Sequence, residues 1–96
     1  MKRQNDQLLK DVIAELLQAY NLKEKTNEVR LLQQWETLFG KTISKYTDKV
    51  FVSNKKLYVH ISSAPLRQEL SYAKEKMVQR INEAIGSDFI REVVIR

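Results

Sequence analysis

The spacing of the apolar residues changes along the chain, and this change most restricts what the chain can fold into. Up to residue 39, apolar residues recur every three or four positions, which is typical of helices that bury one face. Between residues 50 and 61 they alternate with other residues, as in a half-buried strand. From residue 66 to residue 85 the helical spacing returns. This order of patterns predicts an α+β domain.

Two helices are predicted before the first strand. The first carries an apolar stripe and ends before a polar break at residues 21–25. The stripe consists of Leu8, Leu9, Val12, Ile13, Leu16, Leu17 and Tyr20. The second helix runs from about residue 26 to Gly40, because glycine accepts the left-handed conformation that ends many helices. Its buried side is predicted to contain Val29, Leu31, Leu32, Trp35, Leu38 and Phe39. Residues 41–46 fit either a short turn of helix or a loop.

A hairpin and a further helix follow. Residues 50–53 and 57–62 alternate as strands, and residues 54–56 make a tight connection, so the two strands are expected to pair antiparallel. One long helix is predicted from about Ala64 to Ile85, with Ser63 as its N-cap and Gly86 at its end. Its apolar stripe comprises Leu66, Leu70, Ala73, Met77, Ile81, Ala84 and Ile85.

The last eight residues, 89–96, are rich in β-branched side chains and predict a third strand. Either alternate set of its residues could face the core. The predicted order is therefore α-α-β-β-α-β. Helices covering one face of a three-stranded sheet would give a two-layer α+β sandwich. At 96 residues the chain fits one domain, residues 1–96.

Composition limits how this domain is stabilised and where it is expected. The chain has no cysteine, so neither disulfides nor thiolate metal sites contribute, and 43% hydrophobic residues must supply the core. No apolar run approaches the roughly 20 residues that span a bilayer, and the residues after Met1 do not resemble a signal peptide. We therefore expect a cytoplasmic protein with no membrane partner.

The net charge of +5 is unevenly distributed. Residues 1–20 carry three basic and three acidic side chains, whereas residues 21–63 contain four of the five excess positive charges. A basic middle segment favours polyanions or acidic partners.

The sequence contains few residues suited to catalysis, which requires a nucleophile, acid or base beside a second group that adjusts its reactivity. The single histidine, His60, is expected on the strand face turned away from Leu57, Val59 and Ile61. Two glycines cannot form a phosphate-binding loop, and one histidine without cysteine makes a transition-metal site improbable. We expect no enzyme activity and no cofactor or metal; a catalytic function would require His60 beside a carboxylate in a deep pocket.

Cationic side chains are the candidates for binding. The first group approaches and caps the predicted hairpin: Lys41, Lys45, Lys49, Lys55 and Lys56. The second group lies on the exposed side of the later helical segment: Arg67, Lys74 and Arg80. Gathered on one face, the first group would neutralise several phosphates; the alternative is a dispersed lysine surface that maintains solubility. Among the aromatics, Trp35 fits the core, whereas Tyr46, Tyr58 and Tyr72 are better candidates for exposure.

Several short motifs in order resemble one bacterial family. They are Trp35-x4-Gly40, residues 57–63 (LYVHISS), residues 65–70 (PLRQEL), Ile81-Asn82 before Gly86, and residues 93–96 (VVIR). Together they resemble the DciA-like family over almost the whole chain. The resemblance implies a K-homology-like fold and a helper of the replicative DnaB-type helicase that also touches DNA. The Gly-x-x-Gly clamp of true K-homology domains is missing here, so DNA contact would depend on side-chain cations and weaken with salt.

Two functional hypotheses follow. In the first, the chain is a non-enzymatic accessory domain of DNA replication that binds DNA, the replicative helicase, or both. In the second, it is a protein-interaction module without a nucleic-acid role. Its contacts would then come from Tyr58, His60 and Tyr72, or from an unpaired edge of the sheet.

Overall fold

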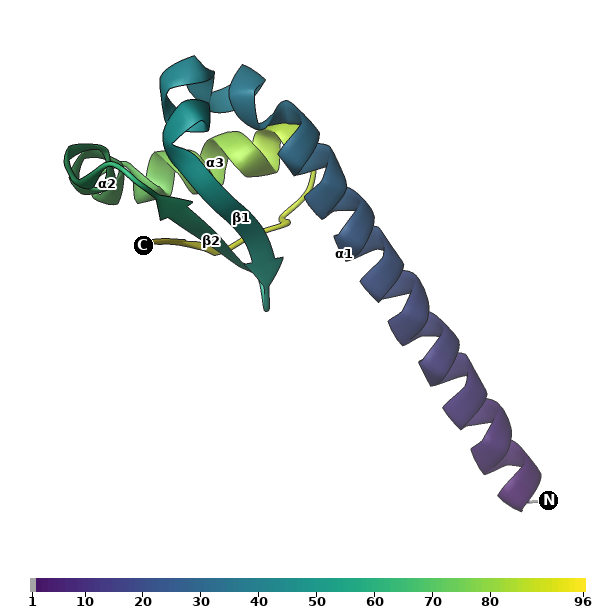
Figure 1. The fold of residues 1–96 in the computed structure, drawn as a ribbon. Coiled ribbons are helices and arrows are strands. Elements are labelled where there is room, and N and C mark those ends of the chain that lie inside the picture. Colours follow the sequence, from purple (N-terminus) through teal and green to yellow (C-terminus); the bar gives the residue numbers. More distant parts are fainter. Residues whose placement is uncertain (1) are drawn as a thin grey trace.

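A computed structural model describes the backbone of residues 2–96 and the side chains of residues 8–96. Three helices and three strands follow the order α-β-β-α-α-β (Figure 1). Their bounds are α1 Lys2–Tyr46, β1 Thr47–Ser53, β2 Lys56–Ile61, α2 Ala64–Ser71, α3 Lys74–Ile85 and β3 Glu92–Ile95. The α+β class is thus confirmed, and the predicted α-α-β-β-α-β order is wrong at both helical regions. No helix of the described chain is long and apolar enough to cross a bilayer.

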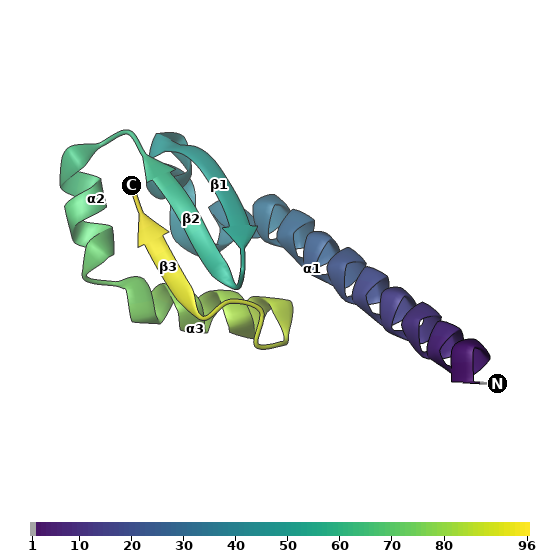
Figure 2. The same cartoon turned by 90° about the horizontal axis from the view of Figure 1, so that it is seen from below.

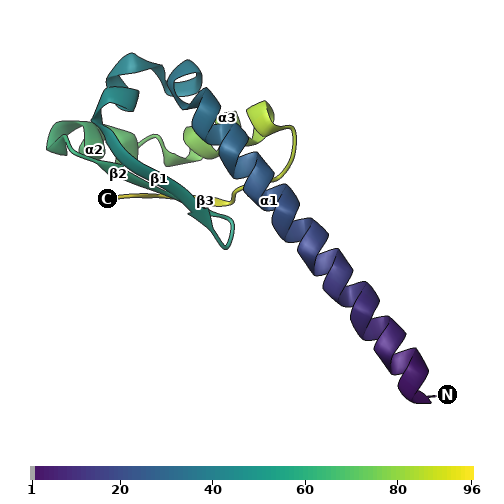
Figure 3. The ribbon, with the colours of Figure 1, turned by 45° about the vertical axis from the view of Figure 1, so that its right-hand side comes forward.

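The polar break predicted at residues 21–25 does not exist, because α1 continues through it. Residues 21–25 contain neither proline nor glycine, and their lysines and glutamate are good helix formers. The first half of α1 projects from the rest of the molecule (Figures 1 and 3), and with this helix included the principal extents are 63 × 21 × 21 Å. The apolar stripe of residues 8–20 is therefore exposed rather than packed against the sheet.

Gly40 interrupts the helical conformation, with φ 91° and ψ 168°. This combination is available essentially only to glycine, so the predicted stop lies at the right residue. Residues 41–46 then form a short helical segment before β1, which resolves the choice between turn and loop.

The sheet has the strand order β1-β2-β3. β1 and β2 form the expected antiparallel hairpin, with Val50 opposite Val59 and Phe51 opposite Tyr58. Its turn consists of Asn54 and Lys55, whose φ angles are 52° and 62°. Positive φ at both central residues is the requirement of a type I′ turn, whose twist matches that of the strands. β3 lies parallel to β2 on its other side.

The predicted helix over residues 64–85 is divided into α2 and α3 at Tyr72 and Ala73. Ser71 Oγ donates a 2.6 Å hydrogen bond to the carbonyl of Gln68, and Tyr72 N–H bonds to Glu69 rather than one residue earlier. A serine that bonds to its own helix backbone offers an alternative to the regular ladder. Ser63 caps α2 as predicted, accepting from Leu66 N–H at 3.4 Å.

The core lies between one face of the sheet and the helices. α1 contributes Leu31 and Trp35, while Val29 and Leu32, also predicted as buried, are exposed. Trp35 is a core residue, as predicted, and its Nε1 donates to Thr47 Oγ1 at 3.1 Å. Among residues 8–96, the buried apolar residues are Leu31, Trp35, Leu57, Val59, Ile61, Leu70, Met77, Ile81, Ile85, Phe89, Ile90 and Val93.

β3 is shorter than the strand predicted over residues 89–96, because Phe89 and Ile90 fold into the core ahead of it. Asn82 holds them there. Its Oδ1 accepts from the backbone N–H groups of Phe89 at 3.1 Å and Ile90 at 2.9 Å, and its Nδ2 donates to the Ile90 carbonyl at 2.8 Å. These hydrogen bonds fix the loop before β3. Val93 then lies on the core face of the sheet, which shows which alternate set of β3 residues faces the core.

Candidate nucleic-acid interface

One face of the sheet is open. Along β2, Leu57, Val59 and Ile61 are buried, whereas the residues between them are not. Cross-strand partners lie on the same side of a sheet, so the register defines the residues of this open face. They are Lys49, Phe51 and Ser53 on β1, Lys56, Tyr58 and His60 on β2, and Glu92, Val94 and Arg96 at β3. No helix lies in front of the three strands when the sheet is seen from below (Figure 2).

A stacked aromatic pair occupies the middle of the open face. Phe51 and Tyr58 are direct cross-strand partners, and their rings lie 4.8 Å apart at an interplanar angle of 8°. The His60 ring follows at 6.2 Å from Phe51. All three side chains are half-buried, so part of each ring is accessible from solvent. The inner faces of Phe51 and Tyr58 are turned to each other, so a nucleobase would stack on an outer ring face of the pair, whatever the base.

Two cations flank the aromatic pair. Lys49 Nζ lies 5.1 Å from the centre of the Phe51 ring, and the Arg96 guanidinium lies 5.2 Å from that of Tyr58. Both distances are within the range of cation–π attraction. Both side chains are exposed, which leaves their remaining N–H groups available to an anion. An incoming base would displace one of these exposed side chains from its ring, and the displaced cation would then be next to the base's phosphate.

Lys56 is also on the open face but is paired, its Nζ lying 3.7 Å from Glu92 Oε2. Both side chains are about half exposed, at 48% and 57%. An ion pair as exposed as this contributes little to stability, and an incoming phosphate can compete with the carboxylate.

The other three lysines of the first predicted group are not on the open face. Lys41 and Lys45 are exposed in the short helical segment after Gly40, where Lys45 Nζ lies 5.7 Å from the ring centre of Tyr46. Lys55 is in the hairpin turn, and its Nζ donates to the Asp88 carbonyl at 3.2 Å. The structure thus brings together Lys49 and Lys56 but distributes Lys41, Lys45 and Lys55 over the neighbouring surface.

The second predicted group lies on the helices that cover the opposite face of the sheet. Arg67 Nη1 donates to the Ile61 carbonyl at 2.6 Å, and Arg80 Nη1 to the Leu38 carbonyl at 3.0 Å. Each arginine therefore fixes one helix to a neighbouring element, although a guanidinium has further donors. Lys74 is the exposed first residue of α3.

Phe51 and Arg96 were not among the predicted site residues. The signal for Phe51 is its position between Val50 and Val52, which places it on the outer side of a strand. No such signal exists for Arg96, because by the sequence pattern either alternate set of residues in the last strand could face the core. Its place is fixed by Arg96 N–H, which bonds to the Val59 carbonyl at 2.8 Å.

In the part of the chain whose side chains are described, no hydrogen bond or salt bridge joins His60 to a carboxylate. A cavity of about 470 Å³ lies beside α3, and its lining includes Phe39, Leu70 and Met77 but not His60. Within residues 8–96, no three histidine or carboxylate side chains are grouped so as to hold a metal ion.

The model of the family described as "Dna[CI] antecedent, DciA" matches residues 8–95. No curated protein and no solved structure matches the chain. The match covers α1 from residue 8 and the open sheet face except Arg96. The family is known for accessory domains related to loading of the replicative DnaB helicase. The chain belongs to the DciA family.

Proposed function

We propose that this domain assists the DnaB-type replicative helicase and holds single-stranded DNA on the open face of its sheet. The observation that carries the DNA half of the proposal is the Phe51–Tyr58 stack with Lys49 and Arg96 over its two rings. Bases of a duplex are already stacked on one another, so stacking on the outer ring faces of this pair favours a single strand.

Binding of this kind is tolerant of sequence. Every base has a flat face, and the open face offers no backbone loop that reads base edges. The element order and the mixed sheet are compatible with a K-homology-like fold of the second topological type. Gly40 and Gly86 are the only glycines, so a Gly-x-x-Gly clamp cannot hold the strand. The aromatic pair takes over that role in our proposal.

The cationic side chains contribute to DNA binding in different ways in this proposal. Lys49, Lys56 and Arg96 contact phosphates beside the stacked bases, because they share the face with the rings. Lys41, Lys45 and Lys55 extend the positive surface along which the DNA strand would run. Arg67, Lys74 and Arg80 lie on the covered side, where they contribute long-range attraction to DNA or contact an acidic partner.

The experiment is a fluorescence-anisotropy titration of labelled single-stranded DNA at several salt concentrations. Replacing Phe51 or Tyr58 by alanine is expected to weaken binding about 5- to 100-fold, the range for loss of one stacked base. Replacing Lys49 by alanine should reduce the slope of log K against log salt by about 0.7, one phosphate contact on a single strand.

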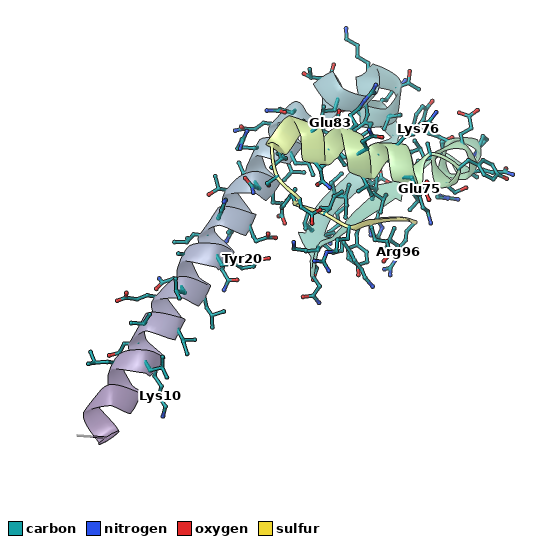
Figure 4. All side chains as sticks on the ribbon, turned by 180° about the vertical axis from the view of Figure 1, so that it is seen from behind. Lys10, Tyr20, Glu75, Lys76, Glu83 and Arg96 are labelled. Atoms are coloured by element: carbon teal, nitrogen blue, oxygen red, sulfur yellow. The ribbon has the colours of Figure 1, made fainter. Side chains whose placement is uncertain are left out.

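Two matched controls belong to the same experiment. Lys10→Ala removes an equal charge from the projecting helix, far from the sheet (Figure 4), and Tyr72→Ala removes an aromatic ring that is 82% exposed outside the open face. Both should leave the affinity within about twofold of the parent. Absence of binding at low salt, or equal losses in Tyr58→Ala and Tyr72→Ala, would refute the DNA half. Nuclease-resistant capture of the helicase would then favour the protein-interaction function alone.

A further inference from the structure

The apolar stripe of α1 has no covering element in the described chain. The exposed fractions of its seven side chains lie between 47% and 64%. A contiguous apolar surface of this kind marks an interaction site rather than ordinary surface. We propose that the stripe binds the same stripe of a second copy of this chain, with the two helices antiparallel.

The spacing within the stripe is that of a coiled-coil seam. Leu9, Ile13, Leu16 and Tyr20 are separated by four, three and four residues, the alternation by which seam positions repeat. In an antiparallel pair each seam residue faces the other type of seam position. The proposed layers therefore place Leu9 of one copy opposite Tyr20 of the other, and Ile13 opposite Leu16. Val12 and Leu17 flank this seam on its two sides.

The stripe also continues the face by which α1 binds its own sheet. Steps of three or four residues lead from Leu16 and Tyr20 through Glu24 and Asn27 to the buried Leu31. The overlap needs only residues 8–21 of each copy, and the first buried residue of the chain's described part is Asn27. The pairing thus uses the part of α1 that precedes its buried residues, and this part reaches the folded body at Tyr20, which lines cavities beside the hairpin turn.

The area available is enough for a small specific interface. A leucine-sized side chain exposes on the order of 100 Å² of apolar surface when fully free, and the seven side chains retain about half to two thirds of theirs. Two copies together would bury roughly 1,000 Å² once flanking atoms are included, which is at the lower limit for specific complexes. We therefore expect a reversible dimer rather than a permanent one.

The distribution of charged residues indicates what the stripe binds and in which direction the two helices pair. Lys10, Asp11 and Glu15 are the charged residues between positions 8 and 20, and none belongs to the stripe, so a polyanion finds no contact there. The whole excess of five positive charges lies in residues 21–96, because residues 1–20 are balanced. In a parallel pair both cationic bodies would adjoin. Antiparallel pairing separates their starting points by about 38 Å along the helices, well beyond the screening length of about 8–10 Å.

Sedimentation velocity tests the dimer without DNA, over about 1 μM to 1 mM chain. The parent chain should pass from monomer to dimer within this range. Leu16→Asp should raise the dissociation constant at least tenfold, while Gln18→Asp, which adds the same charge on the opposite side of the helix, should leave it within about twofold. Fluorescence of the buried Trp35 reports that the body of each variant is folded. A parent that stays monomeric, or equal effects of the two substitutions, would overturn the proposal.

Single cysteines test the direction cleanly, because the chain has none of its own. A disulfide needs Cα atoms about 4.4–6.8 Å apart. Under mild oxidation, a Leu9→Cys chain should cross-link to a Tyr20→Cys chain when the two are mixed, and neither variant should cross-link to itself. Self-linking of each variant without mixed product would mean a parallel pair and would refute the proposed arrangement.

Discussion

Replacing Asn82 by alanine is expected to be the most destabilising change of a polar residue in this chain. The Asn82 amide makes three hydrogen bonds with Phe89 and Ile90, both of which are almost fully buried. Phe89 N–H also bonds to the Ser87 carbonyl at 2.9 Å, so it keeps one acceptor after the change. Ile90 loses its partners on both the N–H and the carbonyl. The damage is therefore concentrated at Ile90.

The magnitude follows from those two groups. A buried backbone group left without a partner costs about 1–3 kcal/mol, so the free energy of unfolding should fall by about 2–4 kcal/mol. For a domain of this size that corresponds to a loss of roughly 10–30 °C in Tm. It is a large part of the ~5–15 kcal/mol that usually stabilises a domain.

Urea denaturation followed by the fluorescence of Trp35, the single tryptophan, measures this change. Gln79→Ala is the matched control, because Gln79 lies on the same helix and its amide bonds only the exposed Glu83 side chain, at 3.3 Å. The control should stay within about 0.5 kcal/mol of the parent. An Asn82→Ala variant that unfolds with the parent's midpoint would show that the loop before β3 does not depend on this amide.

Three further outcomes are expected. Gly40→Ala should lower the free energy of unfolding by about 1–3 kcal/mol through backbone strain alone, because a Cβ there meets no atom within 4 Å; thermal denaturation measures it, and an unchanged Tm would contradict it. Thr47→Val should lower the free energy of unfolding, measured by urea denaturation, by about 1–3 kcal/mol. The Thr47 hydroxyl accepts a hydrogen bond from Trp35 and donates one to the Ile43 carbonyl, and valine can make neither. Thr42→Val, at an exposed position, is the control and should be nearly neutral. The Glu24 carboxylate raises the pKa of the Tyr20 phenol, so Glu24→Gln should lower that pKa toward its usual value in a spectrophotometric pH titration; an equal change in a Tyr20→Phe background would assign it to another tyrosine.

The sequence was sufficient for the features that depend on local spacing. Alternation between residues 50 and 61 predicted the hairpin and placed Tyr58 and His60 on its outer side, as the structure has them. Gly40 and Ser63 marked an interruption and a cap through their own backbone preferences. Each of these depends on neighbouring residues only.

The incorrect predictions concern features that depend on tertiary packing or that have only a weak signal in the local sequence. The stripe of α1 has the pattern of a core-facing helix, and periodicity alone cannot say which surface such a face meets. Nothing in Ser71-Tyr72-Ala73 indicates a helix break as glycine or proline would, so α2 and α3 were predicted as one helix. The Arg96 contact with Tyr58 depends on how the loop at Asn82 sets the register of β3, which spacing does not encode.

The central place of β2 has a consequence for synthesis. The strand that completes its second edge is β3, which comprises residues 92–95 and therefore leaves the ribosome after the other five described elements. Until then the nascent hairpin presents an unmatched edge and an uncovered side at Leu57 and Val59, surfaces that favour aggregation. Completion of the sheet is thus delayed until residues 92–95 have been synthesised, and a chain truncated before residue 92 would lack the strand that closes the sheet.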